Sequence, residues 1–214
     1  MIPGIAAAYI AFSFLGFGGS TINFDGVKPG ALPPYWTALP GWQIRLDDTA
    51  PSRPEVLVRI PPPAVESESS LAIYDKVICR DGDLSVKFKI APTERRAKTV
   101  GMVWRYQDPR NYYLLQFSVD QKHVELFHVQ NGQHRPVLVT GAKPGVTGVP
   151  HDLRPNQWYV ARVVFRGPNF HVLFGNRELF AAVDDSLKAS GKTGLWTEDG
   201  TVASFDDFRI DKKG

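Results

Sequence analysis

The centre of this 214-residue sequence carries side chains that could bind and act on a polyhydroxylated ligand. Arg105, Tyr112, Gln116 and His128 lie in three successive stretches that have the pattern of strands. Arginine and glutamine can donate hydrogen bonds to hydroxyl groups, and a tyrosine ring can stack on the apolar side of a pyranose. Histidine can act as a general base. Because side chains alternate along a strand, we expect these four residues to line one open face of a sheet.

The opposite face of the same strands is expected to pack in the core, through Met102, Trp104, Tyr113, Leu115 and Phe117. Two alternatives stay open for the first face. It could simply be solvated, and a register slip of one residue would exchange the two faces. His128 has its own alternative, since a lone histidine in a strand is more often solvated or hydrogen-bonded than catalytic.

Strands joined by turns are the elements that must position these residues. The sequence has 19 glycines, 17 prolines and 12% aromatic residues, which is typical of many short strands. Leu84–Ile90 alternates with period two, and Asn131-Gly132 is a hairpin turn signal. No long amphipathic helix is expected, although 184–190 could form one helical turn. We expect one β-sandwich, with strands near 22–25, 41–47, 55–60, 74–80, 84–90, 100–106, 111–119, 123–129, 158–166, 170–174 and 202–210, two more strands between the last two of these, and a long loop at 141–155.

Charge and cysteine content argue against several classes of protein. The formal net charge is +3, and the basic residues are scattered. The densest cluster, Arg95, Arg96 and Lys98, is expected to be a solvated loop, and no nucleic-acid-binding motif accompanies it. The single cysteine, Cys79, cannot form an internal disulfide and is expected to be a small buried hydrophobe. The histidine spacing contains no zinc motif.

The N-terminal segment has the features of an export signal. Residues 2–19 contain no charged side chain, and the apolar part has about the length of a signal-peptide core. We therefore expect residues 1–19 to be a signal peptide and residues 20–214 to form one domain that is secreted or periplasmic in a bacterium, without stable membrane insertion. No lysine or arginine precedes Lys28, so a misassigned start or a retained apolar segment is the alternative.

The last forty residues have the order of strands and turns that closes a two-sheet jelly roll. Stretches 101–113, 157–163, 194–197 and 205–210 resemble the 3-keto-disaccharide hydrolase domain family, a branch of the concanavalin A-like lectin and glucanase superfamily. The resemblance covers about residues 24–210. It implies an all-β, two-sheet antiparallel jelly-roll sandwich whose ligand is carbohydrate. Laminin G-like and pentraxin-like modules share much of this pattern.

The resemblance also indicates which reaction to expect. Retaining glucanases of this superfamily use the pattern Glu-x-Asp-x-x-Glu, which places two carboxylates about 5–5.5 Å apart. That pattern is absent, because Glu66 with Glu68 and Glu198 with Asp199 are too closely spaced. We therefore expect cleavage of 3-keto-glycosides instead. A base would remove the proton at C2 of the sugar, and an acid would assist departure of the glycosidic oxygen.

In that reaction Arg105 would polarise the ketone and His128 would transfer protons. Tyr112 and Gln116 would bind the sugar, joined by Trp196, for which core packing is the alternative.

A structural calcium ion is a further expectation from the resemblance. Folds of this kind often hold calcium with an acidic residue of the last strand, so Asp206 and Asp207 are candidate ligands and Asp25 could join them. A salt-bridged strand edge is the alternative, and no cofactor is required. Two other functions remain open: a non-catalytic carbohydrate-binding module, and a laminin G-like structural or adhesion domain. The sequence does not predict the oligomeric state.

Overall fold

The computed structural model describes residues 21–52, 54–62, 69–92, 98–198 and 200–214. Within these ranges the chain forms strands, turns and loops, and no helix. The strands are β1 (Thr21–Ile22), β2 (Trp36–Ala38), β3 (Trp42–Leu46), β4 (Glu55–Arg59), β5 (Ser69–Cys79), β6 (Asp81–Ile90), β7 (Thr99–Asp108), β8 (Asn111–Ser118), β9 (His123–Gln130), β10 (Gln133–Pro136), β11 (Gly148–Pro150), β12 (Trp158–Arg166), β13 (Asn169–Phe174), β14 (Arg177–Val183), β15 (Gly191–Glu198) and β16 (Ala203–Lys213).

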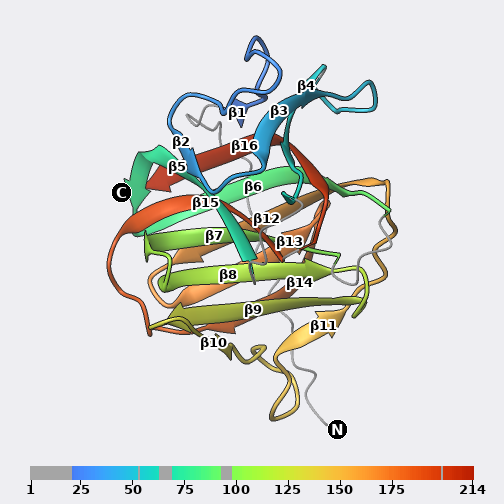
Figure 1. Ribbon diagram of the computed structural model, residues 1–214. Coiled ribbons are helices and arrows are strands. Elements are labelled where there is room, and N and C mark those ends of the chain that lie inside the picture. The colour runs from blue at the N-terminus through green and yellow to red at the C-terminus, as the bar shows by residue number, and fades with distance from the viewer. Residues whose placement is uncertain (1–20, 53, 63–68, 93–97, 199) are drawn as a thin grey trace, which may run out of the picture.

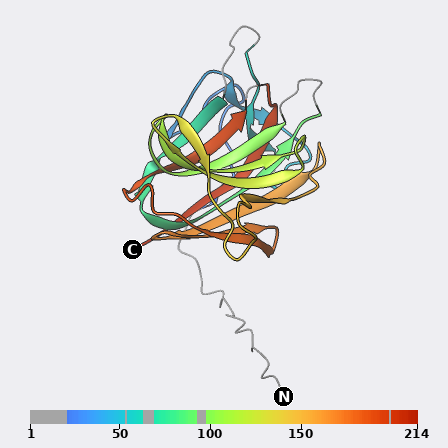
Figure 2. The same cartoon turned by 90° about the horizontal axis from the view of Figure 1, so that it is seen from below.

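The strands form two antiparallel sheets that pack face to face. Sheet A has the order β14-β13-β12-β6-β16-β4-β3, and β1 pairs with β16. Sheet B has the order β10-β9-β8-β7-β15-β5-β2, and β11 pairs with β9. In Figure 1, β7, β8 and β9 of sheet B lie in front of β12, β13 and β14 of sheet A, and the view from below in Figure 2 shows the two layers one above the other. The predicted all-β, two-sheet antiparallel sandwich is confirmed.

The two C-terminal strands each complete the middle of one sheet. β15 lies between β7 and β5, and β16 lies between β6 and β4. The end of the chain is therefore paired on both sides with strands that are far away in sequence. This arrangement explains why the strand pattern of the last forty residues is informative about the whole architecture.

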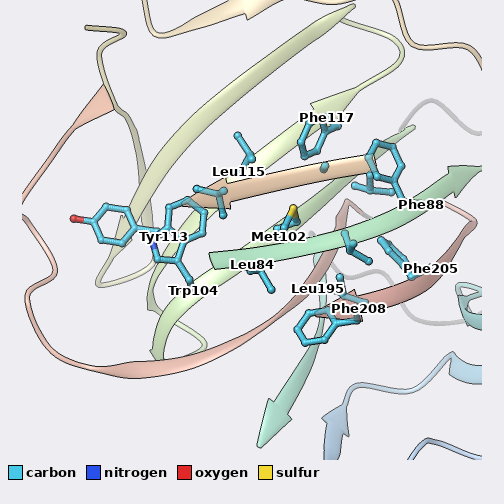
Figure 3. Packing of buried hydrophobic residues seen from close by; sticks show 14 of the residues in the cluster. Leu84, Phe88, Met102, Trp104, Tyr113, Leu115, Phe117, Leu195, Phe205 and Phe208 are labelled. Atoms are coloured by element: carbon cyan, nitrogen blue, oxygen red, sulfur yellow. The ribbon is translucent and has the colours of Figure 1, made fainter. Parts of the chain in front are cut away.

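The core lies between the sheets and follows the predicted alternation. Leu84, Val86, Phe88 and Ile90 of β6 are all 2% exposed or less, as predicted. From sheet B, the Trp104 ring lies 5.5 Å from the Tyr113 ring and 5.7 Å from the Phe165 ring of β12. Figure 3 shows Trp104 and Tyr113 at one end of this packing and Phe88 with Phe117 at the other. Aromatic pairs of this kind bury large apolar areas and bind the sheets together.

A second apolar cluster lies on the other face of sheet B, which we call the outer face. Its members are 8% exposed or less: Leu71, Ile73, Val103, Tyr112, Leu114, Val129 and Trp196. They alternate with core residues along the same strands, so they do not contribute to the packing between the sheets. The alternative that this face is merely solvated is therefore wrong for its central part.

Several elements differ from the sequence-based expectation. The predicted loop 141–155 contains β11, which pairs with β9 at the sheet edge, and the short strands β2 and β10 were not predicted. The segment 184–190 contains no helical turn. Cys79 is 1% exposed, as predicted. No helix in the described ranges is long and apolar enough to cross a membrane.

Some predictions concern segments outside the described residues. These are the signal peptide at 1–19, Glu66, Glu68, Asp199, Arg95 and Arg96.

Candidate functional site

The strand register places two of the four residues predicted to share a face on the same side of sheet B. Tyr112 of β8 pairs with Val129 of β9, and Gln116 of β8 lies between Gly101 of β7 and Glu125 of β9. Both side chains alternate with the core residues of β8. Tyr112 and Gln116 therefore point to the outer face of sheet B, as predicted.

Arg105 lies on the inner side instead, so the prediction that it shares a face with Tyr112 and Gln116 is wrong. The regular pairing of β7 with β8 breaks after Trp104, and Arg105 has a φ of 49°. This β-bulge reverses the direction of the side chain. Arg105 is 1% exposed, and its guanidinium carbon lies 5.7 Å from the centre of the Tyr113 ring.

The guanidinium of Arg105 is held by backbone carbonyls from three separate connections. Nε donates to the carbonyl oxygen of Arg80 at 2.8 Å, and Nη1 donates to that of Leu187 at 2.8 Å. Nη2 donates to the carbonyl oxygen of Gly167 at 2.5 Å. Gly191 lies directly against this bulge, where a side chain would not fit, because a Cβ at Gly191 would lie 2.4 Å from the carbonyl carbon of Arg105. Arg105 thus joins both sheets at one end of the sandwich.

His128 is also on the inner side, which corrects its predicted position. It pairs with Tyr113 across the β8–β9 ladder, and its Nδ1 lies 3.2 Å from Oδ2 of Asp184. The Tyr113 hydroxyl donates to Oδ1 of Asp184 at 2.6 Å. Burial by itself would raise the pKa of Asp184, but hydrogen bonds from Tyr113 and Ser186 and the nearby His128 hold that pKa below its ordinary value.

The predicted site residues therefore separate into two groups on opposite faces of sheet B. Arg105 and His128 converge around Tyr113, between the sheets. Tyr112 and Gln116 face outward, together with Trp196. The catalytic roles of the first pair stay predictions.

Tyr113 connects the inner group, which gives a testable prediction. Its hydroxyl also accepts a hydrogen bond from the backbone N–H of Leu187 at 3.2 Å. Tyr113→Phe removes both bonds and leaves the buried N–H without its acceptor. We expect the free energy of unfolding to fall by about 1–3 kcal/mol. Urea denaturation followed by circular dichroism measures it, and Tyr35→Phe at an exposed position (62%) is the matched control. Equal stability of the two variants would contradict this role.

A cavity of about 270 Å³, which we call the outer cavity, opens on the outer face of sheet B. Its lining residues come from five strands and one turn: Ser69, Thr99, Gln116, Gln121, His134, Trp196 and Glu198. Trp196 is only 3% exposed and belongs to the outer-face cluster. Its ring is therefore a wall of the cavity rather than a fully open platform, and it does not pack in the core between the sheets.

One row of paired residues explains the shape of the outer cavity. Leu71, Trp196, Gly101, Gln116 and Glu125 are successive partners across sheet B. A Cβ at Gly101 would lie 2.6 Å from Cδ1 of Leu114 and 3.3 Å from the Trp196 ring. The missing side chain therefore lets the indole lie directly against β7. No local signal in the sequence indicated this contact.

The polar side chains of the outer cavity have spare hydrogen-bonding capacity. Within the described parts of the chain, the side chains of Gln116, Gln121 and Glu198 have no hydrogen-bond or ion-pair partner. An amide offers two donors and an acceptor, and a carboxylate offers several acceptors. Together they could bind several hydroxyl groups of one ligand beside the ring of Trp196. Sequence reasoning identified Gln116 but missed Gln121, His134 and the position of Glu198 at the cavity.

The two glutamates that the structure describes on this face are too far apart for paired-carboxylate chemistry. Glu125 lies on β9 and Glu198 lies on β15, with β8 and β7 between them. Three strand spacings correspond to about 14 Å. Retaining and inverting glycosidases need about 5–5.5 Å and 6.5–9.5 Å respectively. The described residues of this face therefore do not form either arrangement.

Burial also affects the tyrosine next to the outer cavity. Tyr112 is 2% exposed. Its burial, supported by the neighbouring Tyr106 and partly opposed by Trp196, raises the pKa of its hydroxyl to about 12. Tyr112 therefore stays neutral at physiological pH, and it contributes to the floor of the face as an apolar ring.

A second, smaller cavity of about 190 Å³ lies beside the inner group. It is lined by Arg80, Arg105, Gly167, Pro168, Asp185 and Lys188. His128 is not among the lining residues. Arg105 contacts this cavity, but its guanidinium is already engaged by three carbonyl oxygens.

The three aspartates predicted to bind calcium do not meet. Asp206 accepts hydrogen bonds from the backbone N–H groups of Ser52 at 2.8 Å and Asp207 at 2.7 Å. Asp207 is ion-paired with Lys87 at 2.6 Å, and its other oxygen accepts the Ser52 hydroxyl. No group of three acidic, histidine or cysteine residues that could hold a metal occurs among the described residues, so Asp25 is not joined to this pair. Calcium binding stays a prediction.

Comparison with known proteins supports the architecture. Neither a protein-family model nor a curated protein sequence matches this chain. Among solved structures, the chain is similar to the carbohydrate-binding module CBM66 from Bacillus subtilis, with a TM-score of 0.64 and 17% identity over 83% of this chain and 96% of that chain.

Two glycosidases have similar structures. The β-glucanase of Bacillus licheniformis gives a TM-score of 0.57 at 10% identity, covering 92% of this chain and 99% of that chain. A xylan β-1,4-xylosidase from Bacillus halodurans C-125 gives 0.60 at 19% identity, covering 98% of this chain but only 41% of that chain. At these identities the similarity establishes the fold, a jelly roll of the concanavalin A-like kind.

Proposed function

We propose that this protein binds carbohydrate in the outer cavity of sheet B. The observation that carries the proposal is the set of three polar side chains, Gln116, Gln121 and Glu198, which have no partner in the described chain and surround a cavity with an apolar wall. A sugar presents hydroxyl groups at its edge and C–H groups on its faces. It therefore matches spare amide and carboxylate groups above an apolar surface.

The size of the outer cavity is consistent with a small part of a glycan. Its volume of about 270 Å³ lies just below the range of about 300–1,000 Å³ for typical small-molecule sites. One or two sugar rings fit that range better than a long chain segment. The similarity in fold to a carbohydrate-binding module supports this proposal. Export of residues 20–214 would agree with it and stays a prediction.

The proposal predicts that removing the unpartnered amides weakens binding. Gln116→Ala and Gln121→Ala each delete hydrogen bonds to the ligand without breaking a side-chain bond within the described protein. We expect each change to weaken binding by about fivefold to tenfold, since a neutral hydrogen bond contributes about 1 kcal/mol. A glycan array identifies the ligand, and isothermal titration calorimetry measures the dissociation constants.

Gln43→Ala is the matched control, because Gln43 lies on β3 of the other sheet. It should bind as the wild type does. No binding to any glycan on the array, or unchanged binding by both cavity variants, would contradict the proposed function.

Cleavage of 3-keto-glycosides is the second candidate function. It is favoured by the His128–Asp184 pair, because a carboxylate beside one ring nitrogen orients an imidazole as a base. The outer cavity does not include His128 or Arg105, so this reaction would need a different site. Incubation with 3-keto-glycosides tests it directly. Absence of product would exclude the reaction, and unchanged turnover by His128→Ala would exclude that residue from it.

A further inference from the structure

The surroundings of the outer cavity have an unusual charge distribution. The chain as a whole has a formal net charge of +3, yet the described residues that line this cavity include no lysine or arginine. Two glutamates, Glu198 and Glu125, lie on opposite sides of Gln116 in the sheet. Lys192, at the other end of β15 from Glu198, is ion-paired with Asp75 at 2.6 Å. Of these two carboxylates, Glu198 lines the outer cavity, and Glu125 lies on the strand beyond Gln116.

The two glutamates differ in how far their charges are compensated. The carboxylate of Glu125 accepts a hydrogen bond from the Thr147 hydroxyl, and His123 Nδ1 lies 4.0 Å from its other oxygen. Glu198 lines the cavity and has no such partner in the described chain. Of the two, Glu198 is therefore the carboxylate that a ligand in the cavity would meet without a counter-charge from the described residues.

We propose that the outer cavity selects uncharged glycans against uronic-acid and sulfated ones, and that Glu198 is the residue that determines this selection. This inference rests on the proposed carbohydrate-binding function and names its ligand class. A carboxylate accepts hydrogen bonds from the hydroxyl groups of a neutral sugar. The same carboxylate repels a ligand carboxylate or sulfate, and in a partly enclosed cavity that repulsion is less screened than at an open surface.

Selection of this kind works by rejecting the wrong ligand as well as by attracting the right one. The neighbouring amides of Gln116 and Gln121 can bind either class of ligand, since they both donate and accept. They therefore supply affinity without charge discrimination. Exchanging Glu198 for glutamine keeps the shape and one acceptor but removes the charge.

The experiment uses matched pairs of glycans. Gluco-, xylo-, manno-, galacto- and fructo-oligosaccharides are each prepared in a neutral form and in a sulfated form, and binding to the full chain is measured by calorimetry at low and high salt. We expect the neutral form of the bound sugar to bind at least about tenfold more tightly than its sulfated partner. In Glu198→Gln that ratio should fall several-fold, and high salt should reduce it in the wild type.

Glu55→Gln is the control variant, because it makes the same charge change on β4 of the other sheet. It should leave the ratio unchanged. Equal or tighter binding of the sulfated forms by the wild type would overturn this inference alone, as would an unchanged ratio in Glu198→Gln. Failure of every glycan in both forms would overturn the proposed function, and this inference with it.

Discussion

Arg105→Ala should lower the free energy of unfolding by about 3–5 kcal/mol, because it removes a buried guanidinium and three charge-assisted hydrogen bonds to backbone carbonyl oxygens. For a chain of this size that corresponds to a fall in melting temperature on the order of 10 °C. The substitution leaves three carbonyl oxygens, from Arg80, Leu187 and Gly167, without their donor at the end of the sandwich. It also removes the side chain that joins both sheets there.

Arg105→Lys should be almost as damaging. A single ammonium group cannot reach three carbonyl oxygens that a planar guanidinium contacts in different directions. Its charge would also remain buried beside the Tyr113 ring. This comparison separates the geometry of the side chain from its charge.

Urea denaturation, followed by tryptophan fluorescence, measures both variants. Arg80→Ala is the matched control, since Arg80 is exposed and supplies only its backbone carbonyl to this network. It should change stability by less than about 0.5 kcal/mol. An Arg105→Ala protein as stable as the control would show that the carbonyl contacts contribute little, and would leave Arg105 free for another role.

The second large effect concerns the pH dependence of stability at Asp206. This side chain is fully buried, and burial raises its pKa from 3.8 to about 6, although the N–H groups of Ser52 and Asp207 partly oppose the shift. In the unfolded chain the same carboxyl has its ordinary pKa. Between these two values the folded protein therefore binds a proton that the unfolded chain does not.

The sign of the effect comes from this difference. Because its pKa is raised in the folded state, protonation of Asp206 favours the folded protein. This contribution to the free energy of unfolding is complete below the pKa of the unfolded chain and is lost as the pH rises through about 6. Lowering the pH from about 7 to 4.5 should therefore stabilise the wild type relative to Asp206→Asn by about 2 kcal/mol.

Chemical denaturation at a series of pH values measures this relative stability. Asp185→Asn, at a side chain that is 69% exposed, is the control and should follow the wild type at every pH. A constant difference between wild type and Asp206→Asn from pH 7 to 4.5 would contradict the raised pKa. The amide has only one acceptor oxygen for two N–H donors, so Asp206→Asn should also be less stable at all pH values.

The meander β7–β9 shows how far the sequence predicted the site. Its alternation assigned the inner and outer faces of β8 correctly, so Tyr112 and Gln116 were placed without any structure. Alternation failed for Arg105, because extra residues in a bulge change the face on which the later side chains of the strand lie. For His128 the error had a different cause. The turn between β8 and β9 determines which of their residues pair, so the sequence of either strand alone does not predict this register.

The outer cavity shows a second limit. Gln121 and His134 lie in a turn and on an edge strand, and they reach the cavity only through the way sheet B is assembled. Gly101 looked like an ordinary strand glycine, yet its lack of a side chain lets Trp196 pack against β7. Such contacts involve residues from strands far apart in sequence, so no local pattern predicts them.

Local sequence patterns were sufficient to predict the all-β class, the core alternation of β6 and β8, and the sandwich that the last two strands complete. These features depend on period-two hydrophobicity and turn residues, which act over a few neighbouring positions. Three-dimensional packing was needed to show that Arg105 and His128 turn inward, and that Gln116, Gln121 and Glu198 meet beside Trp196. Bulges, strand register and the convergence of distant loops set these positions, because they depend on packing of the whole chain rather than on neighbouring residues.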